Sequence, residues 1–511
     1  FKVPPFDYQK KAIKFFEMNG GVGILGDQPG IGKSYAAFGY AIKNKLRTLV
    51  VCPSAVKTVW RDQILKFTNE KAFVFKQKTS KKNPVKNPPK DSALIHIINY
   101  ESLATYIKLQ YKHKCSGKKI NLQTKERENC NYEFIDENKA YKECPICKNK
   151  NTIKSKLNTF LLVGDKQDVY LDNEAYDLII LDECHRIKES KTNWTQVIKT
   201  AFQDTTKNKL LLSGTAIKNR PIEFFTPLNF MDKEDWNSRH DFAKRYCAAY
   251  EDTFGWDYNG ASNLEELYER ISPLYLRRLK KDVLPELPEK TFTDIIVEFD
   301  DKEEKEYRKL EKGEEGEDEK SFLAQVHKLK QFTEIIKLKR CEETVLDIVS
   351  EGEKIVIFFD YIKTGQEIMK MFGEEICVLH TGEMNENDRY NSVQKFQTDK
   401  KVKIIGGTIM SMGVGLDLTA ASKLIFVGQA WSNSDMIQCE DRIHRASTTH
   451  ENIQIIKYLC EDTIDMDIHK MLKEKAQIVS KVLDNVDYSQ KVTKGDQSIL
   501  KDIIQKLRKK S

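Results

Sequence analysis

The chain has 511 residues, of which 40% are hydrophobic and 32% charged, and its 84 Lys and Arg against 77 Asp and Glu leave a net charge of +7. This length exceeds one ordinary hydrophobic core and the composition excludes a wholly disordered chain, so we expect two or three folded domains. The near balance of charge excludes a polycation, so any nucleic-acid contact must be a local patch, for example the lysine-rich loop 76–90.

The first half of the chain alternates short β-branched runs with helix-like stretches, which is typical of a parallel sheet with crossover helices. The predicted strands are 48–52, 93–98, 177–181 and 209–212. The pattern turns helical over 231–350 and then returns to strands at 354–359, 376–380, 402–406 and 422–427. We therefore predict an α/β fold with lobes at 1–230 and 351–485, a helical segment at 231–350 between them and a basic helical tail at 486–511.

A glycine-rich loop follows a short apolar strand near the start of the chain, in the segment GVGILGDQPGIGKS at 21–34. Glycines let backbone N–H groups turn toward an anion, and the helix that follows adds the positive end of its dipole. In such a phosphate loop Lys33 supplies a charge for the outer phosphates and Ser34 a ligand for magnesium. Gly30 and Gly32 match the pattern, whereas Asp27 stands where its first glycine belongs. A simple turn remains the alternative for this segment taken alone.

Two acidic residues, Asp182 and Glu183, come directly after the apolar run 178–181. A strand that ends in Asp-Glu places both carboxylates at the carboxyl edge of a sheet, where such sheets bind ligands. There Asp182 can hold the magnesium ion, and Glu183 can orient and deprotonate an attacking water. A solvated turn is the alternative, but the order of the two segments favours a site that binds and hydrolyses ATP.

Two arginines near the end of the second lobe, Arg442 and Arg445, are three residues apart and so share one face of a helix. A planar guanidinium can bind a phosphate oxygen bidentately, and an arginine finger can raise turnover about a thousandfold or more. The sequence therefore predicts that both take part in hydrolysis. A solvent-exposed, salt-bridged helix face, which Glu440 and Asp441 would also suit, is the alternative.

Further motifs surround these segments in a fixed order: Phe6–Gln9, Val50–Pro53 with Trp60, Asn99–Glu101, Ser213–Ala216, Leu276–Val283 before Leu287–Pro288, His380–Gly382 with Arg389, Gly413–Thr419 with Trp431, and Gln438–Arg445. From Phe6 to about Leu483 the chain thus resembles the Swi/Snf-related branch of helicase superfamily two, and Leu276–Val283 is particular to that branch. The resemblance implies two RecA-like lobes that hydrolyse ATP in the cleft between them.

The resemblance also assigns roles to single residues. It implies that Gln9 reads the adenine and that Gly415, Asp417 and Gln438 belong to the nucleotide-binding set. It implies that Trp60 and the segments 50–53 and 99–101 lie on the nucleic-acid side, and that 213–216 couples hydrolysis to lobe movement. The chain departs from the family pattern twice, since Asp417 replaces Asn or Thr and Ala-Ser-Thr at 446–448 replaces Ile-Gly-Gln.

An insertion at 107–172 in the first lobe carries four cysteines, Cys115, Cys130, Cys144 and Cys147. The last two have the two-residue spacing of a zinc knuckle, whereas the first two are irregularly spaced and His113 is a possible substitute ligand. A structural zinc ion is favoured over a disulfide or unliganded thiols. The lysines around Cys115 would let the insertion contact a nucleic-acid backbone, although they can equally be solvated. These lysines are Lys112, Lys114, Lys118 and Lys119.

These features favour an ATP-dependent motor that moves along double-stranded DNA and remodels duplex DNA or protein–DNA complexes, as a compact relative of DNA-repair enzymes. The resemblance, not the composition, favours duplex DNA. A strand-separating DNA or RNA helicase is the alternative within enzymes, and a nucleotide-dependent scaffold that binds through the zinc insertion is the alternative from another class. We expect the protein to be a monomer. We also expect it in the cytoplasm or nucleus, because no long apolar run or signal peptide is visible.

Overall fold

The computed structural model describes residues 1–75, 93–120, 127–136, 141–150, 153–162, 171, 173–214, 220–252, 255–312, 319–413 and 415–473. The chain divides into two compact units. The first comprises Phe1–Ile24, Ser34–Leu212 and Thr226–Asp235, and the second comprises Leu25–Lys33, Ser213–Phe225 and Trp236–Ser511. The predicted basic loop 76–90 and basic tail 486–511 lie outside the described residues.

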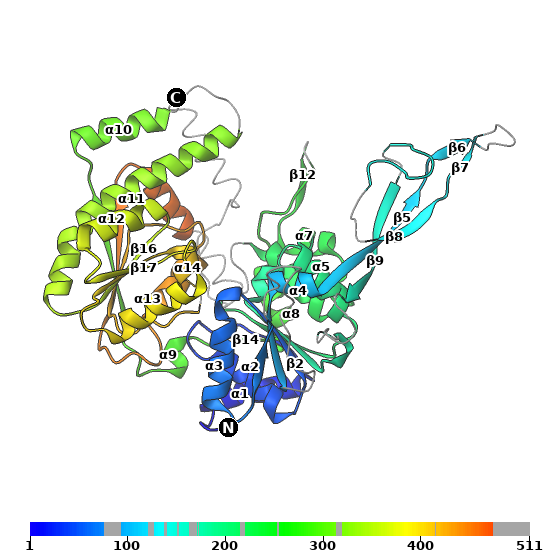
Figure 1. Cartoon of the computed structure of the whole chain (residues 1–511), viewed down its shortest axis with the longest axis horizontal. Helices are drawn as coiled ribbons and strands as arrows, with labels where there is room; N and C mark the ends of the chain where they lie inside the picture. The colour runs from blue at the N-terminus through cyan, green and yellow to red at the C-terminus, as the bar shows by residue number, and fades with distance from the viewer. Residues whose placement is uncertain are drawn as a thin grey trace. The chain divides into compact units, whose positions relative to one another are not determined.

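The first unit is built on a sheet in which the strands follow the order β1-β11-β10-β2-β4-β3 (Figure 1). Their bounds are β1 Val22–Leu25, β2 Thr48–Cys52, β3 Ala72–Val74, β4 Ile95–Asn99, β10 Leu178–Asp182 and β11 Asn208–Leu212. The pairs from β11 to β3 are parallel. Every residue of β2 and β4 is buried, as the continuous apolar runs of a sheet covered on both faces require. The four strands predicted in this half are confirmed, with ends that differ by one or two residues.

Helices pack on this sheet, and their bounds are α1 Asp7–Met18, α2 Lys33–Lys43, α3 Lys57–Phe67, α4 Tyr100–Tyr106, α5 Asn193–Phe202 and α6 Phe225–Met231. Helix α1 buries Gln9, Ala12, Ile13 and Phe16, a spacing that places one apolar stripe against the sheet. The helix α2 begins directly after the glycine-rich loop, so the loop joins a strand end to a helix start.

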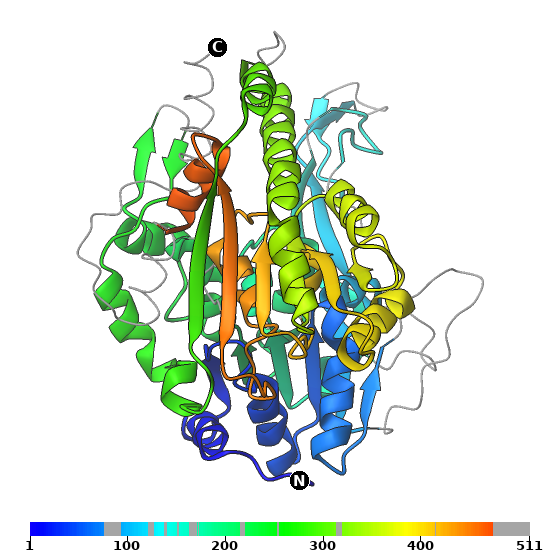
Figure 2. The same ribbon diagram turned by 90° about the vertical axis from the view of Figure 1, so that its left-hand side faces the viewer.

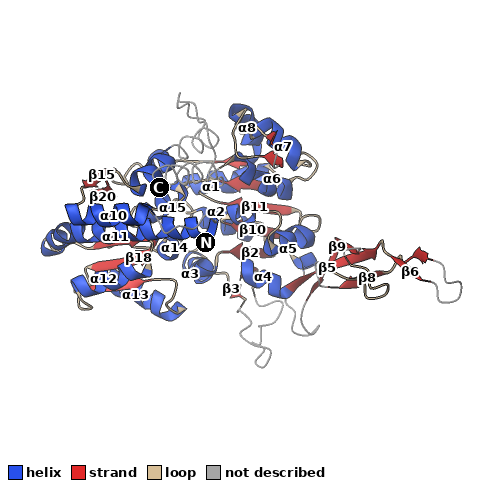
Figure 3. Cartoon of the chain, turned by 90° about the horizontal axis from the view of Figure 1, so that it is seen from above, coloured by secondary structure: helices blue, strands red, loops and turns tan. Residues whose placement is uncertain are grey.

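The predicted insertion folds as antiparallel strands that project from the first unit beyond α4 and α5 (Figures 1 and 3). One sheet has the order β8-β5-β9 and a second pairs β6 with β7. The bounds are β5 Ile107–Cys115, β6 Lys118–Ile120, β7 Arg127–Asn129, β8 Glu133–Asp136 and β9 Ile153–Leu162. Buried and exposed residues alternate along β5, so one of its faces packs inward and the other meets solvent.

The second unit carries a sheet of parallel strands in the order β15-β20-β19-β16-β18-β17. Their bounds are β15 Lys290–Val297, β16 Ile355–Phe359, β17 Cys377–His380, β18 Ile404–Thr408, β19 Lys423–Phe426 and β20 Ile453–Cys460. The strands predicted in this half are confirmed, and two parallel sheets bear out the predicted α/β class.

The interval 231–350, predicted to be helical, also contains strands. These are the hairpin β12 Tyr250–Asp252 and β13 Gly255–Asp257, the short β14 Tyr275–Leu276, and β15, which pairs with β20 along its whole length (Figure 2). The helices of the interval are α7 Arg239–Tyr246, α8 Leu264–Ile271, α9 Lys280–Val283, α10 Asp301–Lys312 and α11 Glu319–Ser350. The sequence prediction failed here because an edge strand half exposed to solvent lacks the apolar run that marks a central strand.

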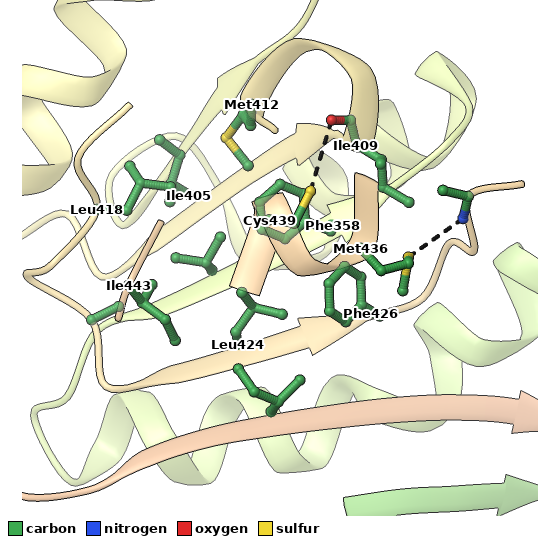
Figure 4. Close-up of a cluster of buried hydrophobic side chains, with 14 of the residues drawn as sticks. Phe358, Ile405, Ile409, Met412, Leu418, Leu424, Phe426, Met436, Cys439 and Ile443 are labelled. Atoms are coloured by element: carbon green, nitrogen blue, oxygen red, sulfur yellow. Dashed lines mark hydrogen bonds between the residues drawn. The ribbon is translucent and has the colours of Figure 1, made fainter. Parts of the chain in front are cut away.

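The remaining helices of the second unit are α12 Ile362–Phe372, α13 Glu386–Thr398, α14 Ile409–Met412 and α15 Asn433–Glu440. One hydrophobic cluster joins the sheet to α14 and α15 through Phe358, Phe426, Met412, Met436 and Cys439 (Figure 4). The thiol of Cys439 donates to the carbonyl oxygen of Ile409 at 3.8 Å. This packing fixes α15 on the sheet, and α15 leads directly into the segment that carries Arg442 and Arg445.

Candidate nucleotide site and cysteine cluster

The glycine-rich loop has the backbone that a phosphate loop needs. Gly30 and Gly32 have φ values of +89° and +96°, a region that side chains disfavour, so glycine is required at both positions. The amino group of Lys33 donates to the carbonyl oxygen of Asp27 at 2.7 Å, which folds this side chain back over the loop. A Cβ atom placed on Gly214 would lie 3.2 Å from the same amino group, so the start of the predicted coupling motif 213–216 lies beside Lys33. The last two residues of this motif lie outside the described residues.

The branch-specific segment 276–280 braces this loop from within the second unit. The N–H of Gly26 donates to the carbonyl oxygen of Leu276 at 2.8 Å, and the N–H of Lys280 donates to Oε1 of Gln28 at 2.7 Å. Arg278 forms a two-point ion pair with Asp27, whose side chain is 1% exposed. Asp27, which departs from the general loop pattern, therefore serves as the buried anchor that ties the loop to Arg278.

Asp182 ends β10 at the carboxyl edge of the first sheet, as predicted, and Glu183 follows it. One carboxylate oxygen of Asp182 accepts from Nε1 of Trp60 at 2.7 Å, and the other accepts from the N–H of Glu183 at 3.1 Å. A carboxylate oxygen is the kind of ligand that magnesium prefers, so the residue type suits the predicted metal site. Glu183 has a φ of +53°, which for a side chain other than glycine costs about 1–3 kcal/mol and is typical of functional sites.

Two aromatic residues position Asp182, which sequence reasoning did not anticipate. Besides the Trp60 bond, the hydroxyl of Tyr100 donates to the carbonyl oxygen of Asp182 at 2.8 Å, and both aromatic residues are buried. The family pattern had suggested that both lie on the nucleic-acid side. Nothing in the local sequence indicates these contacts, since Trp60 and Tyr100 are each separated from Asp182 by a large part of the chain.

The two predicted arginines follow α15 and differ in burial. Arg442 is 5% exposed and donates from Nε to the carbonyl oxygen of Gln438 at 2.7 Å, so its main contacts hold the local backbone. Arg445 is partly exposed, and its Cγ would lie 3.6 Å from a Cβ atom at Gly30. The structure thus places Arg445 beside the phosphate loop within the second unit, and places Arg442 in the support of the same segment.

A buried cluster of charges surrounds the start of this arginine segment. The carboxylate of Asp441 accepts from Lys280 at 2.7 Å and from Lys290 at 2.9 Å. The amino group of Lys280 also donates to the carbonyl oxygen of His444 at 2.6 Å. Burial lowers the pKa of Lys280 from 10.5 to about 8, against the attraction of Asp441. Both Lys280 and Asp441 were seen in sequence motifs, but their pairing was not predicted.

The same cluster affects the ionisation of its other members. Burial also lowers the pKa of His444 to about 4, and Nε2 of this ring lies 2.9 Å from the carbonyl oxygen of Pro288, so the neutral ring donates there. Burial opposes the charge of Asp441, but Lys280 and Lys290 outweigh it and hold the pKa of this carboxyl below its usual range. At neutral pH Asp441 therefore joins two ammonium groups beside a neutral imidazole, and Lys290 also pairs with the buried Glu440 at 3.4 Å.

The two departures from the family pattern in the second half contact each other. The hydroxyl of Ser447 donates to Oδ2 of Asp417 at 3.2 Å, and the hydroxyl of Thr419 donates to Oδ1 at 2.7 Å. Burial would raise the pKa of Asp417, but these bonds and the nearby Arg445 lower it. Asp417 and Ser447 thus form one local unit, and each change from the family pattern accommodates the other.

The remaining predicted nucleotide residues lie in settings that suit backbone support. Gln9 is buried, and its Oε1 accepts from the N–H of Phe6 at 3.0 Å, which closes the first turn of α1. Gly415 has a φ of +78°, and Gln438 is buried in α15. Ser34 lies in the first turn of α2, where a hydroxyl can reach a metal bound at the loop. The direct nucleotide contacts of these residues stay predictions.

The four cysteines of the insertion converge, as the zinc prediction requires. Their sulfur atoms all lie within 4.8 Å of one another, with 3.6 Å between Cys115 and Cys147 and 3.8 Å between Cys130 and Cys144. A disulfide needs about 2.05 Å, whereas sulfurs at the corners of a tetrahedron around zinc, with bonds of about 2.3 Å, lie about 3.8 Å apart. The distances therefore fit a tetrahedral ion and not a disulfide.

His113, the possible substitute ligand, is engaged elsewhere. Its Nε2 lies 3.0 Å from Oδ1 of Asp136, its Nδ1 lies 2.8 Å from the hydroxyl of Ser155, and its ring stacks on Phe134. Both ring nitrogens thus have protein partners. The donor set that fits a metal is the four cysteines, and the N–H of Gly117 supports it by donating to Sγ of Cys115 at 3.2 Å.

Comparison with known proteins gives independent information on the family to which the chain belongs. The SNF2-related domain matches residues 8–356, and the helicase conserved C-terminal domain matches 336–447. The SWI/SNF-related matrix-associated actin-dependent regulator of chromatin subfamily A-like protein 1 of Drosophila melanogaster is 31% identical over 62% of this chain and 43% of its own length. The human DNA annealing helicase and endonuclease ZRANB3 is 23% identical over 97% of this chain and 42% of its own length.

A solved structure, the Sulfolobus solfataricus SWI2/SNF2 ATPase core in complex with dsDNA, covers 99% of this chain and 97% of its own at 21% identity and a TM-score of 0.38. The chain spans less than half the length of the Drosophila and human relatives. In the described part of the chain, we find no helix with the length and apolar character that crossing a membrane requires. Because one family domain matches 8–356, well over half of the chain, the protein belongs to the SNF2-related family, with two RecA-like lobes as predicted.

Proposed function

We propose that this protein is an ATP-dependent motor that moves along duplex DNA and remodels duplex DNA or protein–DNA complexes. The observation that carries the proposal is the phosphate loop at 26–33, with left-handed glycines at Gly30 and Gly32 and with Arg445 beside Gly30. A loop whose glycines let backbone N–H groups turn toward an anion, next to a lysine and an arginine, is a site for a polyphosphate.

In this proposal ATP binds to the loop, and Lys33 moves from the carbonyl oxygen of Asp27 to the outer phosphates. Asp182 and Ser34 hold the magnesium ion, which supplies charge neutralisation at the phosphates when it is bound. Glu183 orients the attacking water and accepts its proton. Arg445 binds an oxygen of the transferred phosphate, and Arg442 keeps that segment in place through its bond to Gln438.

Duplex DNA is the proposed track because of the family and because one relative is a DNA annealing helicase. The brace from 276–280 supports coupling of chemistry to movement. It holds the phosphate loop through Arg278 and, through Lys280, reaches the arginine segment at Asp441. A change in the loop on hydrolysis is therefore transmitted to the segment that carries Arg445.

The cysteine cluster is proposed to hold one structural zinc ion that maintains the fold of the insertion. Four thiolates in a closed tetrahedral set leave no open position for a substrate, as in structural and not catalytic sites. The distances between the sulfur atoms support this assignment.

ATP turnover measured without nucleic acid, and with single-stranded DNA, duplex DNA and RNA, tests the proposed motor. Stimulation by duplex DNA well above the other polymers is the expected result. Strand displacement in the same reactions would favour a strand-separating helicase, and no stimulation by any polymer would favour the scaffold and refute the motor.

A further inference from the structure

Four lysines form a ladder on the exposed face of the insertion sheet. Lys112 and Lys114 lie on β5, and in the register of the sheet they stand directly opposite Lys156 and Lys154 of β9. All four side chains are exposed. Directly paired residues have Cβ atoms about 5 Å apart, and alternate residues on a strand are about 6.8 Å apart. The lysine ladder is therefore a compact block of four ammonium groups.

This arrangement is unfavourable for the insertion by itself, because like charges directly opposite each other destabilise a sheet. One acid offsets part of the charge, since Glu133 on β8 pairs with Lys112 at 2.8 Å and with Lys114 at 3.0 Å. Among the described residues, no acid forms an ion pair with Lys154 or Lys156. Four ammonium groups and one carboxylate leave this face with a net charge of +3.

The other face of the sheet holds the ladder rigid. His113 lies between Lys112 and Lys114 in sequence and is buried on that other face, bound to Asp136 and Ser155. The cysteine cluster begins at the next residue after Lys114. Because both features tie β5 to its neighbours, the backbone positions that carry Lys112 and Lys114 have a fixed spacing before any ligand binds.

Two further lysines lie at the base of the insertion. At the base of β5, Lys108 and Lys191 line a hollow together with Asn193 and Gln196. Side-chain amides and ammonium groups are common donors to phosphate oxygens. The other β5 residues that line this hollow stand at odd positions, on the face opposite to the ladder, so the hollow is a separate basic feature of the insertion.

We propose that the lysine ladder is a second contact surface for duplex DNA, which binds the phosphate backbone irrespective of base sequence. This rests on the proposed function, in which duplex DNA is the track. Protein interfaces are depleted in lysine and enriched in aromatic residues and arginine, whereas binding to a phosphate backbone depends on lysines and arginines that displace counterions. A face of four lysines therefore suits a nucleic-acid backbone better than an acidic protein.

The test uses the full chain with the double substitution Lys154→Ala and Lys156→Ala, which leaves the cysteines and the ion pairs of Glu133 intact. Duplex binding is measured by fluorescence anisotropy without nucleotide, from 50 to 300 mM KCl. The slope of log K against log salt is negative, and each lost phosphate contact makes it less steep by about 0.9. The loss of two contacts should therefore reduce its magnitude by about 1.8, and affinity at 0.1 M salt should drop about tenfold or more.

The matched control removes the same charge from α1 with Lys11→Ala and Lys14→Ala, two exposed lysines outside the insertion. It should leave the slope within experimental error. Glu133→Gln provides a change of opposite sign, since it frees Lys112 and Lys114 and should raise the affinity severalfold. A wild-type slope in the variant with Lys154→Ala and Lys156→Ala overturns the proposal and would favour an acidic protein as the ligand. An equal reduction of the slope in the control also overturns it.

The binding measurement needs no hydrolysis, so its outcome is independent of the motor. If the chain binds duplex DNA through the ladder but shows no stimulated turnover, the ladder assignment holds and the motor fails. If turnover is stimulated and the ladder substitutions have no effect on binding, the motor stands and the ladder assignment is wrong.

Discussion

Substituting the buried lysine of the charge cluster, Lys280→Met, should destabilise the fold at neutral pH. Burial lowers the pKa of Lys280 from 10.5 to about 8, but its amino group also donates to Asp441 at 2.7 Å and to the carbonyl oxygen of His444 at 2.6 Å. Methionine has a similar shape but makes neither bond, so the buried carboxylate of Asp441 loses one of the two lysines that hold it. Removing one partner of a buried ion pair costs about 3–5 kcal/mol. Because Lys290 remains, we expect a loss at the lower end, about 3 kcal/mol.

The loss should depend on pH in a defined direction. Because the pKa of Lys280 is lowered in the fold, the unfolded chain binds its proton more tightly between pH 8 and 10.5, and the stability of the wild type rises with pH across that window. The variant lacks this rise, so its deficit relative to the wild type should be larger at pH 10 than at pH 7.

Thermal unfolding followed by tryptophan fluorescence at pH 7 and at pH 10 measures the effect. For a unit of this size, about 3 kcal/mol corresponds to a decrease of about 6–12 °C in the apparent midpoint. Lys280→Arg is the control, since it keeps the charge beside Asp441 and should lose less stability. An unchanged or raised midpoint at pH 7 in Lys280→Met would mean that the cost of burying the ammonium exceeds the attraction of Asp441, and would refute the reasoning.

Three further outcomes are expected. Lys33→Ala should abolish ATP turnover and leave duplex binding intact, and full turnover in a phosphate-release assay would contradict the phosphate-loop assignment. Arg445→Ala should bind ATP yet hydrolyse it about a thousandfold more slowly. Arg445→Lys should not restore turnover, because an ammonium group cannot bind a phosphate bidentately. An unchanged rate of turnover in Arg445→Ala would contradict a role of this arginine in hydrolysis. A strong chelator should release zinc, detected with a colorimetric dye, and Cys144→Ser should purify without it, whereas a metal-free wild type would end the zinc proposal.

Much of the fold was predictable because the signals were local. A continuous apolar run such as 178–181 marks a strand buried on both faces wherever it occurs. The phosphate loop was equally visible, since the need for glycine at Gly30 and Gly32 comes from backbone conformation within a few residues. Strand β15 escaped prediction because half of its residues face solvent, so its sequence does not carry the period of a central strand.

The sequence by itself predicted the α/β class, the central strands of both sheets and the candidate residues Lys33, Asp182 and Arg445. Only the tertiary structure decided which groups meet. It brought Arg278 to Asp27 across 251 residues, Trp60 to Asp182 across 122 and Lys280 to Asp441 across 161, and it made four irregularly spaced cysteines converge. The physical reason is that periodicity and turn chemistry act over a few residues, whereas these contacts form between segments that folding alone makes neighbours.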